Sequence, residues 1–138
     1  MIFEALFDFQ VKRFYKENPT EYLSDKAGEI PDACYYGVKD HTGNIIAATS
    51  CIHLTDNLVM MQSTMVTPEY RGQGVGKFLN NKLEENLKSK GYGKIVSHIY
   101  VENLPSIILK LKLGYLIEGT LHDHDFKGQH EYVLGKQI

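Results

Sequence analysis

A glycine-rich stretch between a strand-like run and a long helical run is the feature that most constrains the fold of this chain. Residues 58–67 form the strand-like run, residues 75–90 carry apolar side chains at helical spacing, and glycines occupy positions 72, 74 and 76. Glycine adopts backbone conformations that other residues avoid and lets a ligand approach the main chain closely. Amides at the start of a helix point the same way and favour negative charge. The stretch therefore predicts a strand–turn–helix corner suited to a phosphate or pyrophosphate.

Two other phosphate-binding loops fail on spacing. A Walker loop needs four residues between its first glycine and a Gly-Lys pair that Ser or Thr follows, whereas here Lys77 precedes Phe78 and position 71 is arginine. A dinucleotide-binding loop has the pattern G-x-G-x-x-G and follows the first strand of a βαβ unit. This chain has G-x-G-x-G after three strand-like runs, so neither loop is predicted.

The first half of the chain predicts a helix followed by an antiparallel meander. Residues 7–18 place apolar side chains on one helical face, Asn18-Pro19 ends that run, and residues 20–27 suggest another short helical turn. The period then changes to two, with turn signals at residues 40–44 and 55–57. The expected strands of the meander are residues 33–39, 45–54 and 58–67.

The second half alternates helices and strands. The expected elements are a helix over residues 75–90, a strand over 94–101, a helix over 103–113 and a final strand pair over 115–121 and 130–136. A meander that leads into strand–helix–strand–helix predicts a mixed α/β fold with a partly parallel centre. The length of 138 residues suits one domain spanning residues 1–138.

Composition and charge exclude several classes of protein. No apolar run approaches the ~18 residues that a membrane helix needs, and Glu4 and Asp8 stand where a signal peptide is basic and then apolar. We therefore expect a soluble cytoplasmic protein with no membrane partner. The net charge of −2 argues against general nucleic-acid binding. Residues 1–70 hold five Lys and Arg against ten Asp and Glu, whereas residues 71–138 hold ten against seven, which favours an anionic ligand in the second half.

The two cysteines predict no metal centre. Cys34 and Cys51 lie in apolar, strand-like surroundings, and their spacing is not that of a metal site. We expect both to be buried free thiols.

Two motifs resemble one enzyme family. Residues 71–76, Arg-Gly-Gln-Gly-Val-Gly, resemble the pyrophosphate loop of the GNAT superfamily of acetyl-CoA-dependent N-acetyltransferases, whose pattern is Arg/Gln-x-x-Gly-x-Gly/Ala, and Val66, Pro68 and Tyr70 match its common lead-in. Residues 103–115 resemble the family's second helix, commonly Asn-x-x-Ala-x-x-Leu-Tyr-x-Lys-x-Gly-Phe. The resemblance covers residues 33–138 in element order. It implies a GNAT-like mixed sheet that splays between its fourth and fifth strands, with acetyl-CoA in the gap.

The resemblance also assigns the cofactor-binding residues. The amides of residues 71–76 should bind the pyrophosphate, and residues 65–67 should pair their backbone with the pantetheine arm, which Asn103 should also bond. The implied cofactor-binding residues are Met65, Val66, Thr67, Arg71, Gly72, Gln73, Gly74, Val75, Gly76, Lys77, Asn103 and Ser106. Asn103 is also a good plain helix cap, Lys77 is also explained as an ordinary exposed helix lysine, and the glycine-rich corner need not hold a ligand.

The catalytic positions depart from the family's pattern. Lys110 stands where many members carry the tyrosine that protonates the departing thiolate, and His98 and Gln62 stand where others carry a glutamate. A histidine titrates near working pH, so His98 is the candidate base, directly or through water. Tyr100 shares its strand face and is a reserve acid. His98 is equally explained as a structural strand histidine, and Lys110 as an acid, a phosphate contact or neither.

The histidine-rich segment near the end of the chain suggests a metal site only weakly. The residues concerned are His122, Asp123, His124, Asp125 and His130. The family needs no metal, so we expect a polar loop beside the acceptor, with Glu118 and Glu131 helping to attract a cationic amine.

The sequence thus predicts an acetyltransferase that moves acetyl from acetyl-CoA to an amine of a small molecule or protein by direct attack in a ternary complex. The alternative is a catalytically silent acyl-CoA-binding or sensor domain, which the missing tyrosine and glutamate favour. Transfer to a hydroxyl, or of a longer acyl group, is a third hypothesis. The acceptor is not readable from the sequence, and a homodimer is left open.

Overall fold

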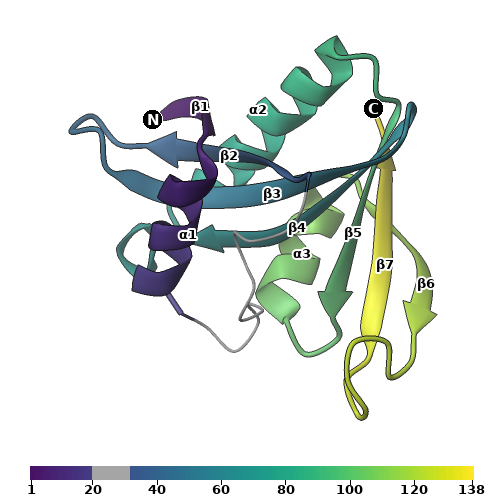
Figure 1. The fold of residues 1–138 in the computed structure, drawn as a ribbon. Helices are drawn as coiled ribbons and strands as arrows, with labels where there is room; N and C mark the ends of the chain where they lie inside the picture. The colour runs from purple at the N-terminus through teal and green to yellow at the C-terminus, as the bar shows by residue number, and fades with distance from the viewer. Residues whose placement is uncertain (20–31) are drawn as a thin grey trace.

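The computed structural model describes residues 1–19 and 32–138, and the helical turn expected over residues 20–27 lies outside them. The described residues form a seven-stranded sheet in the order β1-β2-β3-β4-β5-β7-β6, with three α-helices and one 3₁₀ turn (Figure 1). The strands are β1 (Ile2–Leu6), β2 (Cys34–Lys39), β3 (Ile45–Thr55), β4 (Leu58–Val66), β5 (Lys94–Tyr100), β6 (Leu116–Leu121) and β7 (Glu131–Gln137). The helices are α1 (Asp8–Glu17), η1 (Pro68–Tyr70), α2 (Val75–Ser89) and α3 (Leu104–Lys112). The predicted mixed α/β fold is confirmed.

The sequence prediction lacked the first strand. β1 pairs antiparallel with the outer side of β2, from Ile2 opposite Lys39 to Leu6 opposite Tyr35. Its five residues alternate poorly between apolar and polar side chains, so the backbone pairing with β2 determines the strand, and the side-chain period does not reveal it. The chain opens with a strand and then a helix, and not with a helix alone.

The meander forms as expected. β2 and β3 join through a tight turn in which the Asp40 carboxylate accepts hydrogen bonds from the Thr42 and Asn44 amides, at 2.9 and 3.1 Å. Aspartate stabilises such turns because its short side chain reaches the amides that follow it. β3 and β4 then pair antiparallel, with a register shift opposite Ala48 and Ser50.

The centre of the sheet is parallel, and it is there that the sheet splays. β4 and β5 pair in parallel only from Leu58 opposite Lys94 to Met60 opposite Val96. Both strands continue beyond that point, β4 to Val66 and β5 to Tyr100, and Figure 1 shows them diverging. Among residues 1–19 and 32–138, no strand therefore pairs with the last part of β4 on its β5 side.

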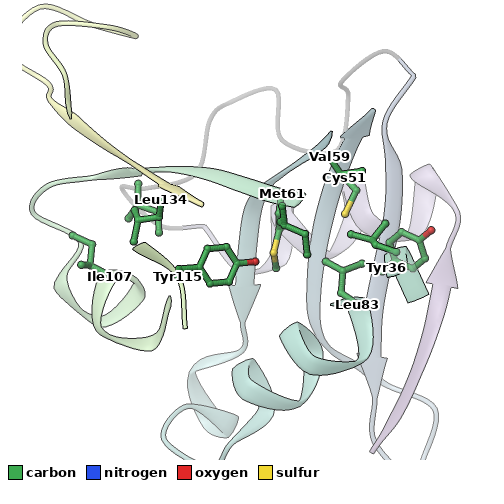
Figure 2. Close-up of a cluster of buried hydrophobic side chains, with 11 residues drawn as sticks. Tyr36, Cys51, Val59, Met61, Leu83, Ile107, Tyr115 and Leu134 are labelled. Atoms are coloured by element: carbon green, nitrogen blue, oxygen red, sulfur yellow. The ribbon is translucent and has the colours of Figure 1, made fainter. Parts of the chain in front are cut away.

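Helices cover both faces of the sheet. α1 lies against one face, where Val11, Phe14 and Tyr15 pack with residues of β2, β3 and β4. α2 and α3 lie on the other face, where their residues share the largest core cluster with Met61 of β4 and Leu134 of β7 (Figure 2). None of the helices in the two described stretches is long and apolar enough to cross a bilayer.

The two cysteines differ in exposure, contrary to the expectation that both are buried. Cys51 lies in the middle of β3 and belongs to the core cluster, whereas Cys34 is exposed. The two residues lie directly opposite each other in the β2–β3 ladder. Cys34 begins β2, and side chains at the end of a strand have fewer neighbours than those at its middle.

Candidate active site

The glycine turn between β4 and α2 adopts the backbone that its sequence predicts. Gly72 and Gly74 have φ angles of +73° and +84°, and Gly74 is the N-cap residue of α2. A Cβ atom at either position would meet nothing within 4 Å, so the left-handed backbone, and not crowding, requires glycine there. Gly76 serves a different purpose: a Cβ there would lie 3.1 Å from Leu109 Cδ2, so this glycine lets α2 pack closely against α3.

The backbone amides of the turn are available to a ligand. Among the described residues, the amides of positions 72–76 donate to no backbone or side-chain acceptor. The turn itself is held by Gln73, whose Nε2 donates to the Glu69 carbonyl at 2.8 Å. The turn suits an anion for three reasons. Its amides are free, it lies at the positive end of a 15-residue helix, and there is open space above two glycines. Lys77 is exposed in the first turn of α2.

The end of β4 presents polar backbone toward the splay. The Thr67 amide donates to the Ile46 carbonyl of β3 at 2.9 Å, and hydrogen-bonding directions alternate along a strand. The Val66 backbone therefore faces the open side, where its carbonyl accepts a hydrogen bond from Arg71 Nε at 3.1 Å. The Thr67 hydroxyl is buried and has no hydrogen-bond partner. An orphaned hydroxyl beside free amides is an observation that a ligand at this corner would explain.

A bulge interrupts β4 just before this segment. Ser63 has a φ of +55°, and the β3–β4 register shifts opposite it. The Tyr15 hydroxyl of α1 donates to the Ser63 carbonyl and lies 3.5 Å from Ser50 Oγ. Burial raises the pKa of Tyr15 far above its ordinary value, so this phenol remains a donor at neutral pH. α1 therefore holds the bulge from the face opposite α2.

His98 and Tyr100 lie on the β5 side of the splay, on the face opposite α2 and α3. The β5–β7 register places Val133 opposite His98 and Glu131 opposite Tyr100. His98 is half-buried, and its pKa is lowered chiefly by burial and further by His124, although Asp125 opposes the shift. An imidazole with a lowered pKa is neutral at pH 7 and able to accept a proton.

Tyr100 and Glu131 are tied to the loop between β6 and β7. The Tyr100 hydroxyl donates to Asp125 Oδ2 at 3.0 Å, and burial together with Asp125 raises the pKa of Tyr100 to about 12. Glu131 is buried, with 4% of its surface exposed, and burial and Asp125 raise its pKa as well. The polar loop expected from the sequence is present, and it lies against β5.

Lys110 is buried on the opposite face, beside the point where β4 and β5 separate. Its Nζ donates to Asn80 Oδ1 at 2.8 Å and lies 3.0 Å from Met61 Sδ and 4.5 Å from the centre of the Tyr115 ring. No carboxylate pairs with it among the described residues. Burial lowers its pKa to about 7. The Lys110 side chain thus carries a proton that is easily lost, and it lies close to the point where β4 and β5 separate.

Asn80 connects Lys110 to the glycine turn. While Asn80 Oδ1 accepts from Lys110, Asn80 Nδ2 donates to the Gly76 carbonyl at 2.8 Å. Sequence reasoning missed this residue. The available signal was its position, since Asn80 is a polar residue next to Leu79 and Leu83, within the apolar stripe of a helix.

Asn103 stands at the start of α3 without capping it through its side chain. Its backbone amide donates to the Tyr100 carbonyl at 2.9 Å, and no side-chain capping bond forms. The plain-cap explanation therefore does not account for this asparagine in the structure. Ser106 lies half-buried in the first turn of the same helix.

Comparison with known proteins agrees with this geometry. The sequence matches the acetyltransferase (GNAT) family over residues 3–115. The chain belongs to that family. No curated protein matches the sequence.

Solved structures of N-acetyltransferases share the whole fold of this GNAT chain. An aminoglycoside 6'-N-acetyltransferase complexed with coenzyme A superposes with a TM-score of 0.80 at 16% identity, covering 99% of this chain and 97% of that one. A spermidine/spermine N-acetyltransferase from Vibrio cholerae gives 0.77 at 18% identity, covering 99% and 93%. An IAA acetyltransferase from Bacillus cereus gives 0.83 at 16% identity, covering 99% of each chain.

Asn103 and Ser106 lie at the start of α3, and the other predicted site residues of the GNAT chain fall into three groups. The residues around the glycine turn and the end of β4 lie together at one corner. His98 and Tyr100 lie on the α1 face of β5, next to the β6–β7 loop, whereas Lys110 lies in the core on the other face. The structure thus separates the candidate base from one candidate acid by the sheet.

Proposed function

We propose that this protein transfers an acetyl group from acetyl-CoA to a primary amine by direct attack. The proposal rests on the corner at the start of α2. Its amides are free, there is open space above Gly72 and Gly74, and β4 and β5 stop pairing beside it, after Met60. The corner fits a pyrophosphate, and the Val66 backbone and the orphaned Thr67 hydroxyl fit an extended amide-containing arm. One related structure is complexed with coenzyme A. We place the arm between β4 and the start of α3, the part of the fold in which Asn103 and Ser106 stand.

The reaction requires a proton to leave the amine. A lysine-like amine has a pKa of ~10.4, so about one molecule in a few thousand is neutral at pH 7. His98 is the base in this proposal, because it is a half-buried imidazole whose pKa is lowered and which lies on the strand that borders the splay. The amine nitrogen forms its bond to the thioester carbonyl carbon as the carbon–sulfur bond breaks, and His98 takes the amine's proton.

The departing thiolate must gain a proton. Lys110 is the better matched acid, because a group with a pKa of about 7 gives up its proton near neutral pH, whereas Tyr100 at about 12 holds its own tightly. No cysteine lies in either motif to form an acyl-enzyme.

The acceptor approaches from the α1 face, near the β6–β7 loop. The acidic groups of that loop favour a cationic amine. The cytoplasmic location and the single domain stay predictions, and a homodimer stays an open alternative.

Acetyl-CoA binding is tested with two matched glycine variants. Gly74 and Gly43 both have left-handed φ angles and open space for a Cβ, but Gly43 lies in the β2–β3 turn. Gly74→Glu and Gly43→Glu should therefore carry similar backbone strain, of about 1–2 kcal/mol. Acetyl-CoA at ~100 times its dissociation constant should stabilise the wild type and Gly43→Glu by ~2.7 kcal/mol. Gly74→Glu should lose that effect, and a wild type without any melting shift would overturn the proposal.

The second candidate function is a sensor that binds acyl-CoA without turnover. The absence of the family's usual tyrosine and glutamate, at Lys110 and His98, favours it. Turnover with a panel of amines separates the two functions. The panel should include spermidine and aminoglycosides, the acceptors in the names of the structural neighbours, and several acyl-CoA thioesters. Cofactor binding without acylation of any member would favour the sensor.

A further inference from the structure

Three groups with metal-binding chemistry converge beside β5. They are the imidazole of His98 on β5, the imidazole of His124 in the β6–β7 loop and the carboxylate of Glu131 at the start of β7. One ligand atom from each lies within 4.8 Å of the others, and the His98 and His124 rings are 5.8 Å apart, edge to face. Each group comes from a different element, so the loop must fold back onto the sheet to bring them together.

A second observation points to a missing partner at the same place. Glu131 is 4% exposed, and its Oε2 is buried without a hydrogen-bond partner. Buried carboxylate oxygens ordinarily accept a hydrogen bond or bind a cation, so a cation beside Glu131 would satisfy this atom.

The spacing suits a small ion. Three atoms that lie within 4.8 Å of one another have a common point no more than about 2.8 Å from each. Zinc binds nitrogen and oxygen ligands at about 2.0–2.2 Å, so a movement of about 0.7 Å by each side chain closes the site. His124 is exposed on a loop and can move by that amount. Two imidazoles and one carboxylate are a ligand set of borderline softness that favours zinc and its neighbours over calcium or magnesium.

We propose that His98, His124 and Glu131 form a binding site for a divalent transition-metal ion of the zinc type. Of the three histidines that the sequence placed together in this segment, only His124 belongs to the cluster. His122 and His130 contact each other instead, with ring centres 5.1 Å apart, and lie outside the cluster. The acetyl transfer proposed above needs no metal. An ion on His98 occupies the nitrogen that the base would use, so the ion acts as an inhibitor, and this consequence alone rests on the proposed function.

Metal binding is tested on metal-free protein by titration with Zn²⁺ in a calorimeter and with Co²⁺ followed by its visible absorption. The wild type should bind one ion. His124→Asn and Glu131→Gln should each weaken binding by at least ~10-fold, the lower range seen when even an outer partner of a ligand is lost. His122→Asn is the matched control from the same loop and should bind like the wild type. Melting of each variant, followed by circular dichroism, shows whether the buried Glu131→Gln variant still folds, and the exposed His124→Asn variant tests the site independently of that result.

Three results would overturn the site: no binding to the wild type, unchanged binding to His124→Asn, or loss of binding in His122→Asn, which would place the ion on the other histidine pair. Inhibition is a separate measurement. Zn²⁺ should slow amine acetylation by the wild type but should not slow acetylation by His124→Asn, each protein being compared with its own rate in metal-free buffer. If the protein binds Zn²⁺ yet acetylates no amine, the site stands and the proposed function fails.

Discussion

Replacing Lys110 with methionine should make the protein more stable at neutral pH. Lys110 is fully buried, and its pKa of about 7 lies well below the ordinary lysine value of 10.5. A difference of roughly 3.5 in pKa corresponds to about 5 kcal/mol lost by burying the ammonium group. The substitution also leaves Asn80 Oδ1 without its donor, which costs about 1–3 kcal/mol. Methionine fills a similar volume flexibly, so Lys110→Met should gain about 2–4 kcal/mol.

The lowered pKa of Lys110 also predicts how the free energy of unfolding changes with pH. A lysine whose folded pKa is lowered destabilises the protein fully below pH 7, where both states hold the proton. Between pH 7 and 10.5 the unfolded chain holds the proton that the folded chain loses, so the stability of the wild type rises with pH. The difference between Lys110→Met and the wild type should therefore shrink by about 2 kcal/mol from pH 7 to 9.

Urea unfolding of both proteins at pH 6, 7, 8 and 9 measures this difference. Comparison of the two proteins removes the contribution of titrating groups that do not interact with Lys110. Cys51 does interact with it, but burial raises the pKa of Cys51 to about 12, so its thiol stays protonated in the folded protein over this pH range. A variant that is less stable than the wild type, with a difference that does not change with pH, would refute the reasoning. It would show that the contacts of Nζ with Asn80, Met61 and the Tyr115 ring offset the cost of burial.

Three other changes test the site and its support. His98→Gln should lower kcat by ~10²–10⁴-fold in metal-free buffer and leave the affinity for acetyl-CoA unchanged, whereas His53→Gln, on β3, should leave both kcat and the affinity unchanged; equal kcat values for the two variants would make His98 structural. Tyr15→Phe should cost about 1–3 kcal/mol in urea unfolding, since the Ser63 carbonyl at the bulge loses its donor, and a smaller loss would mean that water replaces the phenol. Gly76→Leu should destabilise by about 1–3 kcal/mol, because its side chain would meet Leu109, and a neutral result would mean that α3 moves away easily.

Local sequence signals predicted the corner at α2 well. The left-handed angles at Gly72 and Gly74 and the helix that follows them depend on neighbouring residues, which a sequence displays directly. The parallel β4–β5 pair was also predictable, because a strand–helix–strand unit allows few alternatives. The exposure of Cys34 was predicted wrongly, because its place at the end of β2 depends on the tertiary structure around it.

Side-chain partners brought together by the sheet were not predictable. His98 and Glu131 are 33 positions apart and meet only because β7 inserts between β5 and β6. Asn80 and Lys110 come from two helices that pack on the same face of the sheet. In each case the sequence shows the residue type but not its partner. Alternation and helical spacing indicate on which face of a strand or helix a residue lies, and they do not indicate which faces pack together.

The contacts of Lys110 connect the two halves of the proposed cofactor site. Asn80 bonds both Lys110 and the Gly76 carbonyl in the first turn of α2, so the ammonium is linked to the backbone of the anion-binding corner. Met61, whose Sδ also lies beside Nζ, follows the last parallel pair, and its carbonyl accepts a hydrogen bond from Ser97 Oγ at 2.9 Å. Burial of the Lys110 ammonium lowers the free energy of unfolding by several kcal/mol. This lysine thus lies between the glycine turn and the point where β4 and β5 separate. Its protonation would change the hydrogen bonds of both at once, and this position supports, beside its pKa of about 7, the proposal of Lys110 rather than Tyr100 as the acid.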